Sequence, residues 1–232
     1  MVEGKIMAAA PVLADHCITM QNISWATYES LLREAKGERL RLAYDNGDIE
    51  FMTLSFGHEN IAETIGLFIR AVALALNIPI RGGGSTTLKR KLKRKGLEPD
   101  KCYWIENERA MRGQTKWVAK KHPPPDLAVE VDISHSAINR MGIYASLGVP
   151  EVWRYKGKKL RVYRLGDDNR YQESAASPTF PHLDMAKVNE FVQAAASMDE
   201  TALLREFSAW VRKEILPLAE GRKNCKKSKD NN

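Results

Sequence analysis

The chain has 232 residues, of which 44% are hydrophobic, so it is long enough for one domain to bury a substantial core without disulfides. Its formal net charge is +7, and its three scattered cysteines form no C-x-x-C pair, which excludes a zinc-finger spacing and favours a reducing, cytoplasmic location. No apolar run approaches the roughly 20 residues of a membrane helix, so no membrane association is expected.

The first predicted elements are a helix, a hairpin and a longer helix. Ser24 is placed to cap the first helix, and Gly37 is placed to end it. Strands over residues 41–44 and 49–54 follow, and the Asn-Gly pair between them is a strong hairpin signal. A helix over residues 58–76 carries its aliphatic side chains on one face, and its first histidine is interpreted as orienting the helix.

A glycine run and a basic run come next. The segment Arg-Gly-Gly-Gly-Ser at residues 81–85 lacks the G-K-[ST] ending of a phosphate-binding loop and is interpreted as a flexible turn. Six of the seven residues from 89 to 95 are basic, namely Lys89, Arg90, Lys91, Lys93, Arg94 and Lys95. Such a run is either a solvated strand edge or a surface that binds the phosphates of a nucleic acid.

The second half of the chain alternates strands and helices. Strands are predicted over residues 102–106, 127–133, 152–155 and 160–165. Ser134 or Ser136 is placed to cap a helix that Gly148 ends. We expect a poorly ordered start over residues 1–17, a domain over 18–183, a helical extension over 184–218 broken near 197–199, and a basic tail over 219–232. This order indicates an α+β (α/β) fold with a central mixed sheet flanked by helices.

The strand over residues 127–133 places acids on one face. Asp126, Glu130 and Asp132 alternate with aliphatic residues, so all three carboxylates point to the same side. Glu130 and Asp132 are about 6.6 Å apart along the strand, close enough to flank one cation. The alternative is an amphipathic strand with a solvated acidic face.

Three residues match the needs of a metal-dependent phosphodiesterase, which requires two acids and a positive charge near the phosphate. Asp100 opens one strand, Glu130 lies in the next, and Arg140 follows ten residues later on a helix. The three groups converge if the strands pair and the helix folds back over them. Otherwise Asp100 is a turn acid and Arg140 is a surface cation.

Motifs in this region resemble the Uma family of putative restriction endonucleases, which is common in cyanobacteria and belongs to the PD-(D/E)XK nuclease superfamily. The motifs are Glu-Pro-Asp ending at Asp100, Pro-Pro-Pro-Asp-Leu-Ala-Val-Glu-Val ending at Val131, and Gly-Val-Pro-Glu-Val-Trp ending at Trp153. The resemblance covers about residues 20–183. It implies a restriction-endonuclease-like fold, with the first acid at the start of one hairpin strand and the second acid in the next.

The resemblance also implies roles for particular residues. Asp100 and Glu130 correspond to ligands of Mg²⁺ (or Mn²⁺), and the carbonyl of Val131 would be a further ligand. The family's upstream helix matches the segment that begins at residue 58, where Glu59 or Glu63 would orient a second metal or a water.

The chain departs from the superfamily pattern at the lysine, because Asp132 stands two positions after Glu130. In the family that lysine is commonly displaced to the following helix, four residues before a tyrosine, which is the position of Arg140. Arginine keeps its charge at any working pH but does not act as a base. Asp132 either adds a third metal-facing carboxylate or marks a sequence that has drifted from catalysis.

The function expected from these observations is metal-dependent hydrolysis of phosphodiester bonds in double-stranded DNA, with the basic run guiding the backbone. The alternative is a catalytically degenerate nuclease-fold module that binds nucleic acid or protein without cleavage. By analogy with superfamily nucleases that cut both strands, we also expect a homodimer.

Overall fold

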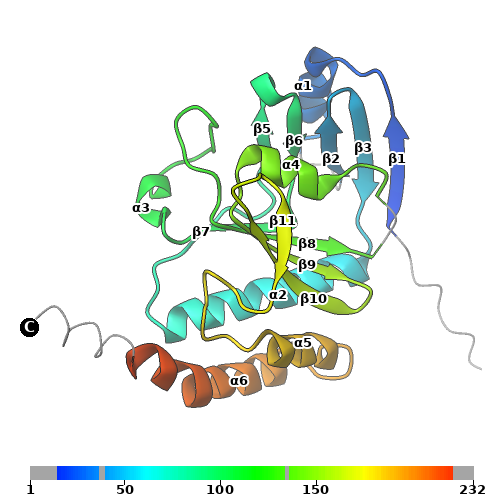
Figure 1. Ribbon diagram of the computed structural model, residues 1–232. Helices are drawn as coiled ribbons and strands as arrows, with labels where there is room; N and C mark the ends of the chain where they lie inside the picture. Colours follow the sequence, from blue (N-terminus) through cyan, green and yellow to red (C-terminus); the bar gives the residue numbers. More distant parts are fainter. Residues whose placement is uncertain (1–14, 37–39, 134–135, 222–232) are drawn as a thin grey trace, which may run out of the picture.

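The computed structural model describes residues 15–36, 40–133 and 136–221 (Figure 1). The helices are α1 (Trp25–Glu34), α2 (Phe56–Ala75), α3 (Glu108–Met111), α4 (Arg140–Leu147), α5 (Met185–Ala194) and α6 (Glu200–Trp210), with a 3₁₀ turn at Lys91–Lys93 and a π-helical turn at Val211–Ile215. The strands are β1 (His16–Met20), β2 (Leu40–Asp45), β3 (Asp48–Thr53), β4 (Arg81–Gly82), β5 (Leu88–Arg90), β6 (Lys95–Leu97), β7 (Lys101–Trp104), β8 (Leu127–Asp132), β9 (Glu151–Lys156), β10 (Lys159–Leu165) and β11 (Tyr171–Ser174).

The described strands form two sheets. The first is antiparallel with the order β1-β3-β2-β6-β5, and the second has the order β11-β10-β9-β8-β7-β4. The second sheet is mixed because β8 and β9 are parallel. The α+β class is therefore confirmed, and the second sheet is the expected central mixed sheet flanked by helices, to which the first, antiparallel sheet is added. The chain crosses between the sheets from β3 to β4, from β4 to β5 and from β6 to β7, and the segment between β6 and β7 is the shortest of these connections.

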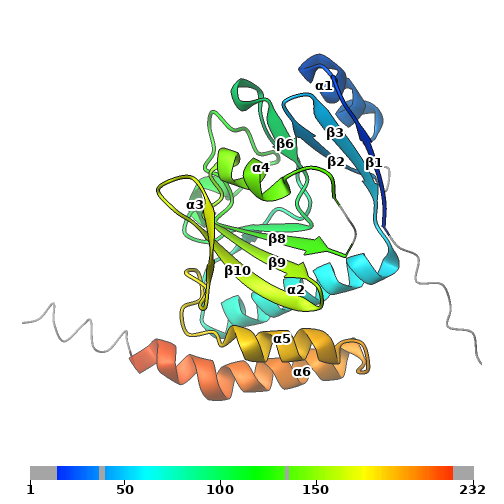
Figure 2. The same cartoon turned by 45° about the vertical axis from the view of Figure 1, so that its right-hand side comes forward.

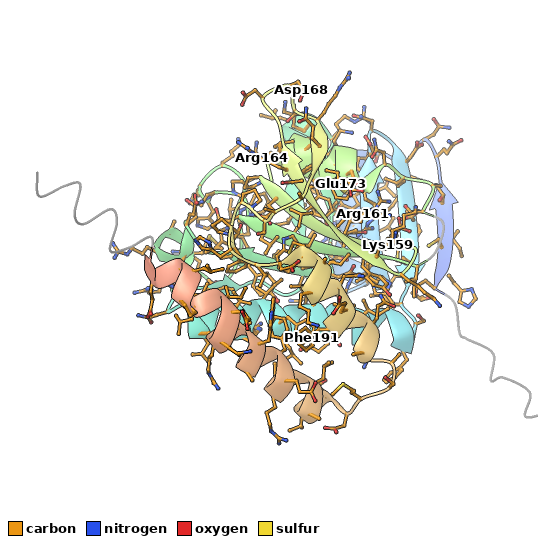
Figure 3. All side chains as sticks on the ribbon, turned by 60° about the horizontal axis from the view of Figure 1, so that its bottom comes forward. Lys159, Arg161, Arg164, Asp168, Glu173 and Phe191 are labelled. Atoms are coloured by element: carbon orange, nitrogen blue, oxygen red, sulfur yellow. The ribbon has the colours of Figure 1, made fainter. Side chains whose placement is uncertain are left out.

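Helix α2 covers one face of the second sheet, and α5 and α6 lie beyond it (Figures 1 and 2). Aliphatic side chains of β8 pack in this layer, as their alternation predicts, with Val129 and Val131 buried in the same cluster as α2 residues. Phe68 of α2 stacks on Phe207 of α6 with ring centroids 4.0 Å apart. Phe191 of α5, labelled in Figure 3, meets Phe207 edge-on at 5.2 Å. This aromatic contact joins the predicted C-terminal helices to the core.

Helix α4 packs against the opposite face of the second sheet and also contacts β5 and β6 of the first (Figure 2). Its Ile143 and Leu147 are buried with Ala128 of β8 and Leu97 of β6. The helix therefore lies between the two sheets, beside the segment between β6 and β7. The acidic side chains of β8 point to this same side of the second sheet, toward α4.

Two of the expected helix signals are confirmed and one is wrong. The Ser24 side chain accepts a hydrogen bond from the Thr27 amide at the start of α1, and Gly148 ends α4 in the left-handed conformation at φ 81°. However, α4 is capped by Asn139 rather than by Ser134 or Ser136. Ser136 instead donates its hydroxyl to Glu50, a residue of β3 that no local pattern connects to it. Ser134 lies outside the described residues.

The ends of the domain differ from the predicted boundaries. Strand β1 begins at His16 and pairs with β3, and Asp15 before it is buried, so the folded domain begins before residue 18. Residues 1–14 and 222–232, which include most of the predicted basic tail, lie outside the described residues. Arg81 and Gly82 are not a free turn, because they pair with β7 as β4. No helix in the described part of the chain has the length and apolarity needed to cross a membrane.

A close backbone contact under α1 gives a test of this packing. A Cβ at Gly96 of β6 would overlap the Tyr28 hydroxyl and lie 3.0 Å from Lys89 Cβ, whereas one at Gly57 of α2 would meet nothing closer than 4.0 Å. We expect Gly96→Ala to lower the free energy of unfolding by about 1–3 kcal/mol. Gly57→Ala is the matched control and should be neutral or slightly stabilising in urea unfolding. Equal stability of the two variants would contradict the described contact of α1 with the first sheet.

Candidate active site

The pairing of β7 with β8 brings the two predicted acids together. Lys101 lies opposite Val129 in the antiparallel register, so the next pair along the ladder is Asp100 and Glu130. The Val131 amide donates a hydrogen bond to Asp100 Oδ2 at 2.7 Å. Asp100 and Glu130 are 6% and 3% exposed. The structure thus forms the acidic pair from residues 30 positions apart in the sequence.

Arg140 and Tyr144 cover Glu130 from the first two turns of α4. Arg140 Nε donates to Glu130 Oε1, and the Tyr144 hydroxyl donates to Glu130 Oε2 at 2.6 Å. Arg140 Nη2 also donates to the main-chain oxygen of Glu98 at 3.0 Å. The spacing of four residues places both donors on one helix face, so α4 supplies the positive charge and the hydroxyl together.

Burial and neighbouring charges shift the pKa values of Glu130, Arg140 and Tyr144. Loss of solvent raises the pKa of Glu130, the Arg140 charge opposes that rise, and the nearby Asp100 charge adds to it, so the pKa stays above its usual value. Burial lowers the pKa of Arg140, but the charge of Glu130, together with smaller contributions from Tyr144, Asp100 and the hydrogen bond to Glu130, outweighs burial and the pKa rises. Burial also raises the pKa of Tyr144, which keeps it a donor. Arg140 is therefore a permanent counter-charge for Glu130.

His58 links Asp100 to the start of the domain. Its Nε2 donates to Asp100 Oδ1 and its Nδ1 donates to Asp15 Oδ2, both at 2.8 Å, and the imidazole is 1% exposed. Burial lowers the pKa of His58, but the two carboxylates more than compensate and raise it to about 10. The ring is therefore an imidazolium between two carboxylates. Asp15 also accepts from the Ser55 amide at 2.7 Å, which anchors the start of α2.

Glu50 of β3 is a further buried acid beside Arg140. It accepts hydrogen bonds from the Ser136 hydroxyl at 2.9 Å and the Ala137 amide at 3.0 Å, and Arg140 Nη1 lies 4.0 Å away. Glu50 thus holds the loop that leads into α4. The sequence analysis did not identify Glu50 or Asp15, because no local spacing connects either residue to the groups it contacts.

The buried cluster carries an excess of negative charge. Its titratable members are Asp15, Glu50, Asp100, Glu130, His58 and Arg140. Four carboxylates face two cations, so the cluster has a formal charge of two negative when all its members are ionised. Such an excess favours binding of a divalent cation, and carboxylate oxygens are the ligands that Mg²⁺ prefers. Within the described ranges, however, no group of three His, Cys, Asp or Glu residues is arranged to hold a metal.

Asp132 does not join Asp100 and Glu130 as the expected third carboxylate. It is paired with Arg154 and with Lys156 Nζ at 2.9 Å, both on β9. These residues line a cavity of about 120 Å³ together with Glu130 and Arg140. Three cations and two acids surround the cavity, so an anion such as a phosphate fits its charge better than a second metal does.

Glu59 and Glu63 also lie outside the cluster. Glu59 is exposed on α2 with Arg41 Nη2 at 3.7 Å, and Glu63 pairs with Lys101 Nζ at 2.5 Å. Neither residue is among the acids that the structure brings around Arg140. The residue of α2 that contacts the buried acids is instead His58, one position before Glu59.

The predicted basic run forms a hairpin of β5, the 3₁₀ turn and β6, which we call the basic hairpin (residues 88–97). Lys89 pairs with Glu29 at 2.9 Å and Lys95 pairs with Asp45, so two of its six cations are partly neutralised. The tip is exposed and holds three more cations, Lys91, Lys93 and Arg94. The free positive charge of the hairpin is therefore concentrated at its tip.

A comparison with known protein families agrees with the motifs. A model of the family Uma2, described as a putative restriction endonuclease, matches residues 25–216. No curated protein matches the chain. Among solved structures, the chain is similar to the crystal structure of a putative nuclease belonging to DUF820 from Anabaena variabilis, with 14% sequence identity, a TM-score of 0.44, and coverage of 65% of this chain and 90% of that chain.

The His58 geometry predicts a loss of stability at alkaline pH. The pKa of His58 rises from 6.5 to about 10 on folding, so between these values the folded state holds one proton more than the unfolded state. The free energy of unfolding should fall as the pH rises from 7 to 9, by up to about 1.4 kcal/mol per pH unit. Urea unfolding at both pH values measures this slope. His58→Gln should remove it and His16→Gln, at an exposed position, should keep it; a slope unchanged in His58→Gln would refute the assignment.

Proposed function

The chain belongs to the Uma2 family of putative restriction endonucleases, and on that premise we propose that it is a metal-dependent endonuclease that hydrolyses phosphodiester bonds in double-stranded DNA. The observation that carries the proposal is the buried pair of Asp100 and Glu130 on adjacent strands, with the Arg140 guanidinium on Glu130. Two adjacent acids and one fixed positive charge are the groups that metal-assisted phosphodiester hydrolysis requires.

The donor chemistry of the pair fits a hard divalent cation. Asp100 and Glu130, with the Val131 carbonyl, would hold Mg²⁺ or Mn²⁺, and one or two carboxylates suffice when water and phosphate complete the shell. A cation bound there would activate a water and offset charge on the phosphate. The excess of two negative charges in the buried cluster supports this assignment.

The chain's own cations act on the phosphate. Arg140 remains charged at any working pH, so its role is electrostatic stabilisation and not proton transfer. Arg154 and Lys156 line the cavity next to it and attract the same anion. His58 holds Asp100 in place through its Nε2 donor, so the carboxylate keeps a fixed orientation.

The basic hairpin would contact the DNA backbone away from the cleaved bond. Its second strand, β6, leads directly into Glu98, Pro99 and Asp100. Its exposed tip carries Lys91, Lys93 and Arg94. Lysine and arginine side chains that neutralise phosphates supply affinity without sequence preference. The hairpin therefore suits a role in positioning the duplex.

A second candidate is a nuclease-fold module that binds nucleic acid without cleaving it. One observation favours it, because both oxygens of Glu130 and both oxygens of Asp100 already accept hydrogen bonds. Arginine in place of the usual lysine also removes a residue able to release a proton. Metal binding and cleavage distinguish the two functions.

We expect Glu130→Gln and Asp100→Asn to abolish Mg²⁺-dependent plasmid nicking and to weaken Mn²⁺ binding in calorimetry. These isosteric changes are preferable to alanine, because an amide oxygen still accepts the hydrogen bond from buried Arg140, whereas alanine leaves the guanidinium with no partner there, at a cost of about 3–5 kcal/mol. Arg140→Gln should reduce nicking about 10²–10³-fold, the usual cost of losing one electrostatic donor.

The matched control for these variants is Glu59→Gln, an exposed acid of the neighbouring helix, which should nick DNA and bind Mn²⁺ as the wild type does. Thermal unfolding of every variant establishes that it is folded. Full nicking by folded Glu130→Gln would overturn the proposed site. A folded wild type that neither binds Mn²⁺ nor nicks DNA would establish the non-catalytic module instead.

The hairpin assignment predicts a change in salt dependence. Replacing Lys91 and Lys93 with alanine should weaken duplex binding and reduce the slope of log affinity against log salt by about 1.8, since each lost phosphate contact contributes about 0.9. The control replaces Lys187 and Lys213, two exposed lysines of the C-terminal helices, and should keep the wild-type slope. Identical slopes in both double variants would exclude the hairpin as the backbone-contacting surface.

A further inference from the structure

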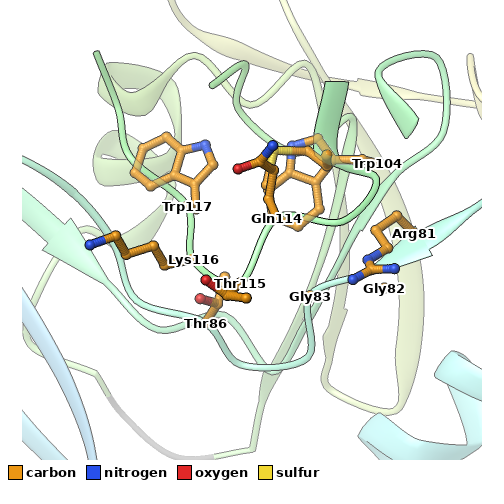
Figure 4. Close-up of a pocket in the computed structure, with 10 residues that line it drawn as sticks. Arg81, Gly82, Gly83, Thr86, Trp104, Gln114, Thr115, Lys116 and Trp117 are labelled. Atoms are coloured by element: carbon orange, nitrogen blue, oxygen red, sulfur yellow. The ribbon is translucent and has the colours of Figure 1, made fainter. Parts of the chain in front are cut away.

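A second cavity, of about 180 Å³, lies beside β4 and the end of β7 (Figure 4). Two tryptophans, a glycine run and several polar side chains surround it, and we call it the indole pocket. Its lining residues that matter here are Trp104, Trp117, Gly83, Arg81, Gln114 and Lys116. The indole pocket shares no lining residue with the cavity beside Glu130 and Arg140.

The two indoles are held in fixed positions. Trp104 Nε1 and Trp117 Nε1 both donate to the main-chain oxygen of Pro123, at 3.1 and 2.7 Å. Trp104 is 2% exposed and Trp117 is 9% exposed, so only limited ring surface faces the cavity. Because their polar atoms already have partners, the rings offer the cavity apolar aromatic surface.

The glycine run forms another wall of the cavity, and its close packing against β7 explains why glycine is needed there. A Cβ at Gly83 would lie 2.5 Å from Trp104 Cζ3 and 2.7 Å from Cys102 Sγ, so only glycine permits this approach to the indole. The Gly83 amide donates to the Cys102 carbonyl at 2.8 Å, which ties the run to β7. The backbone, rather than a side chain, therefore borders the cavity here.

Exposed polar side chains stand at the rim of the indole pocket (Figure 4). Arg81 and Lys116 supply positive charge on opposite sides, and Gln114 supplies an amide that both donates and accepts. In the described part of the chain, no hydrogen bond and no ion pair within 4 Å engages these three side chains. They are available to a ligand with an aromatic ring, hydrogen-bonding edges and a negative charge.

The indole pocket is linked to the acidic pair by a single strand. Asp100 directly precedes β7, and Cys102 and Trp104 alternate with it along the chain, so the three side chains point to one face of the second sheet. The four-residue step from Asp100 to Trp104 spans about 13 Å. That distance is about four nucleotides along one strand of B-DNA, at 3.4 Å each.

We propose that the indole pocket binds one unstacked nucleobase of the nucleic acid, a few nucleotides from the bond at Asp100 and Glu130. The part of the Trp117 ring that faces the cavity contacts one side of the base, Gln114 reads the base edge, and Arg81 and Lys116 meet the flanking phosphates. The volume is below the roughly 300–1,000 Å³ of sites for drug-sized ligands, so a single ring system fits. This inference rests on the proposed function, since it places the base of the same substrate.

The test compares a short single-stranded DNA with an abasic strand of equal length and charge, bound by fluorescence anisotropy without added divalent metal. Trp117→Leu should weaken binding of the normal strand about ten-fold and leave the abasic strand unchanged, since it removes the aromatic surface that contacts the base. Trp210→Leu is the control, because Trp210 packs against Phe191 and Phe207 of the C-terminal helices and lines neither the indole pocket nor the cavity beside Glu130 and Arg140. It should not change the ratio of the two affinities.

A second variant keeps the test valid if Trp117→Leu does not fold. Gln114 is exposed, so Gln114→Ala should preserve the fold and still reduce the preference for the normal strand over the abasic one. Equal loss for both strands, or no loss with either folded variant, would overturn the base pocket. Because the assay needs no cleavage, a protein that prefers the normal strand but fails to nick DNA would separate this result from failure of the proposed nuclease activity.

Discussion

The ion pair between Glu130 and Arg140, buried between the two sheets, is the interaction on which this structure depends. Both side chains are less than a tenth exposed, so neither charge has water to replace its partner. Removing one member of such a pair leaves the other charge buried and costs about 3–5 kcal/mol. The pair therefore requires α4 to sit over β8, and this placement also positions Tyr144 and the loop that Glu50 holds.

Buried charges also connect parts of the chain that lie far apart in the sequence. Asp15 lies before β1, His58 lies in the first turn of α2, and Asp100 precedes β7. The two hydrogen bonds of His58 join these three residues in the interior. The start of the domain is thereby fixed to the acidic pair. The cluster has more carboxylates than cations, which opposes folding in the absence of a further cation. Groups suited to chemistry on a phosphate thus also determine the pH dependence of stability.

Local patterns allowed prediction of much of the fold and of three residues that the structure brings together. Apolar periodicity located α1, α2 and the C-terminal helices, and the Asn-Gly signal located the β2–β3 hairpin. Asp100, Glu130 and Arg140 came from spacing and from the family resemblance. Ser134 or Ser136 was expected to cap α4, yet Ser136 bonds to Glu50. Asp132 was expected either to add a third metal-facing carboxylate or to mark drift from catalysis, and it pairs with Arg154 and Lys156. Each of these departures involves a partner that is remote in the sequence.

The sequence by itself determined the helices, the hairpins and the acids available for a site, because these depend on residues within a few positions of one another. Only the tertiary structure decided which charges meet. The register of β7 against β8 places Asp100 opposite Glu130, and a shift of one residue would turn the acids to the other face. Asp15 and Glu50 joined the cluster through long-range packing, which stabilises a buried charge only when a partner from another element is in contact with it.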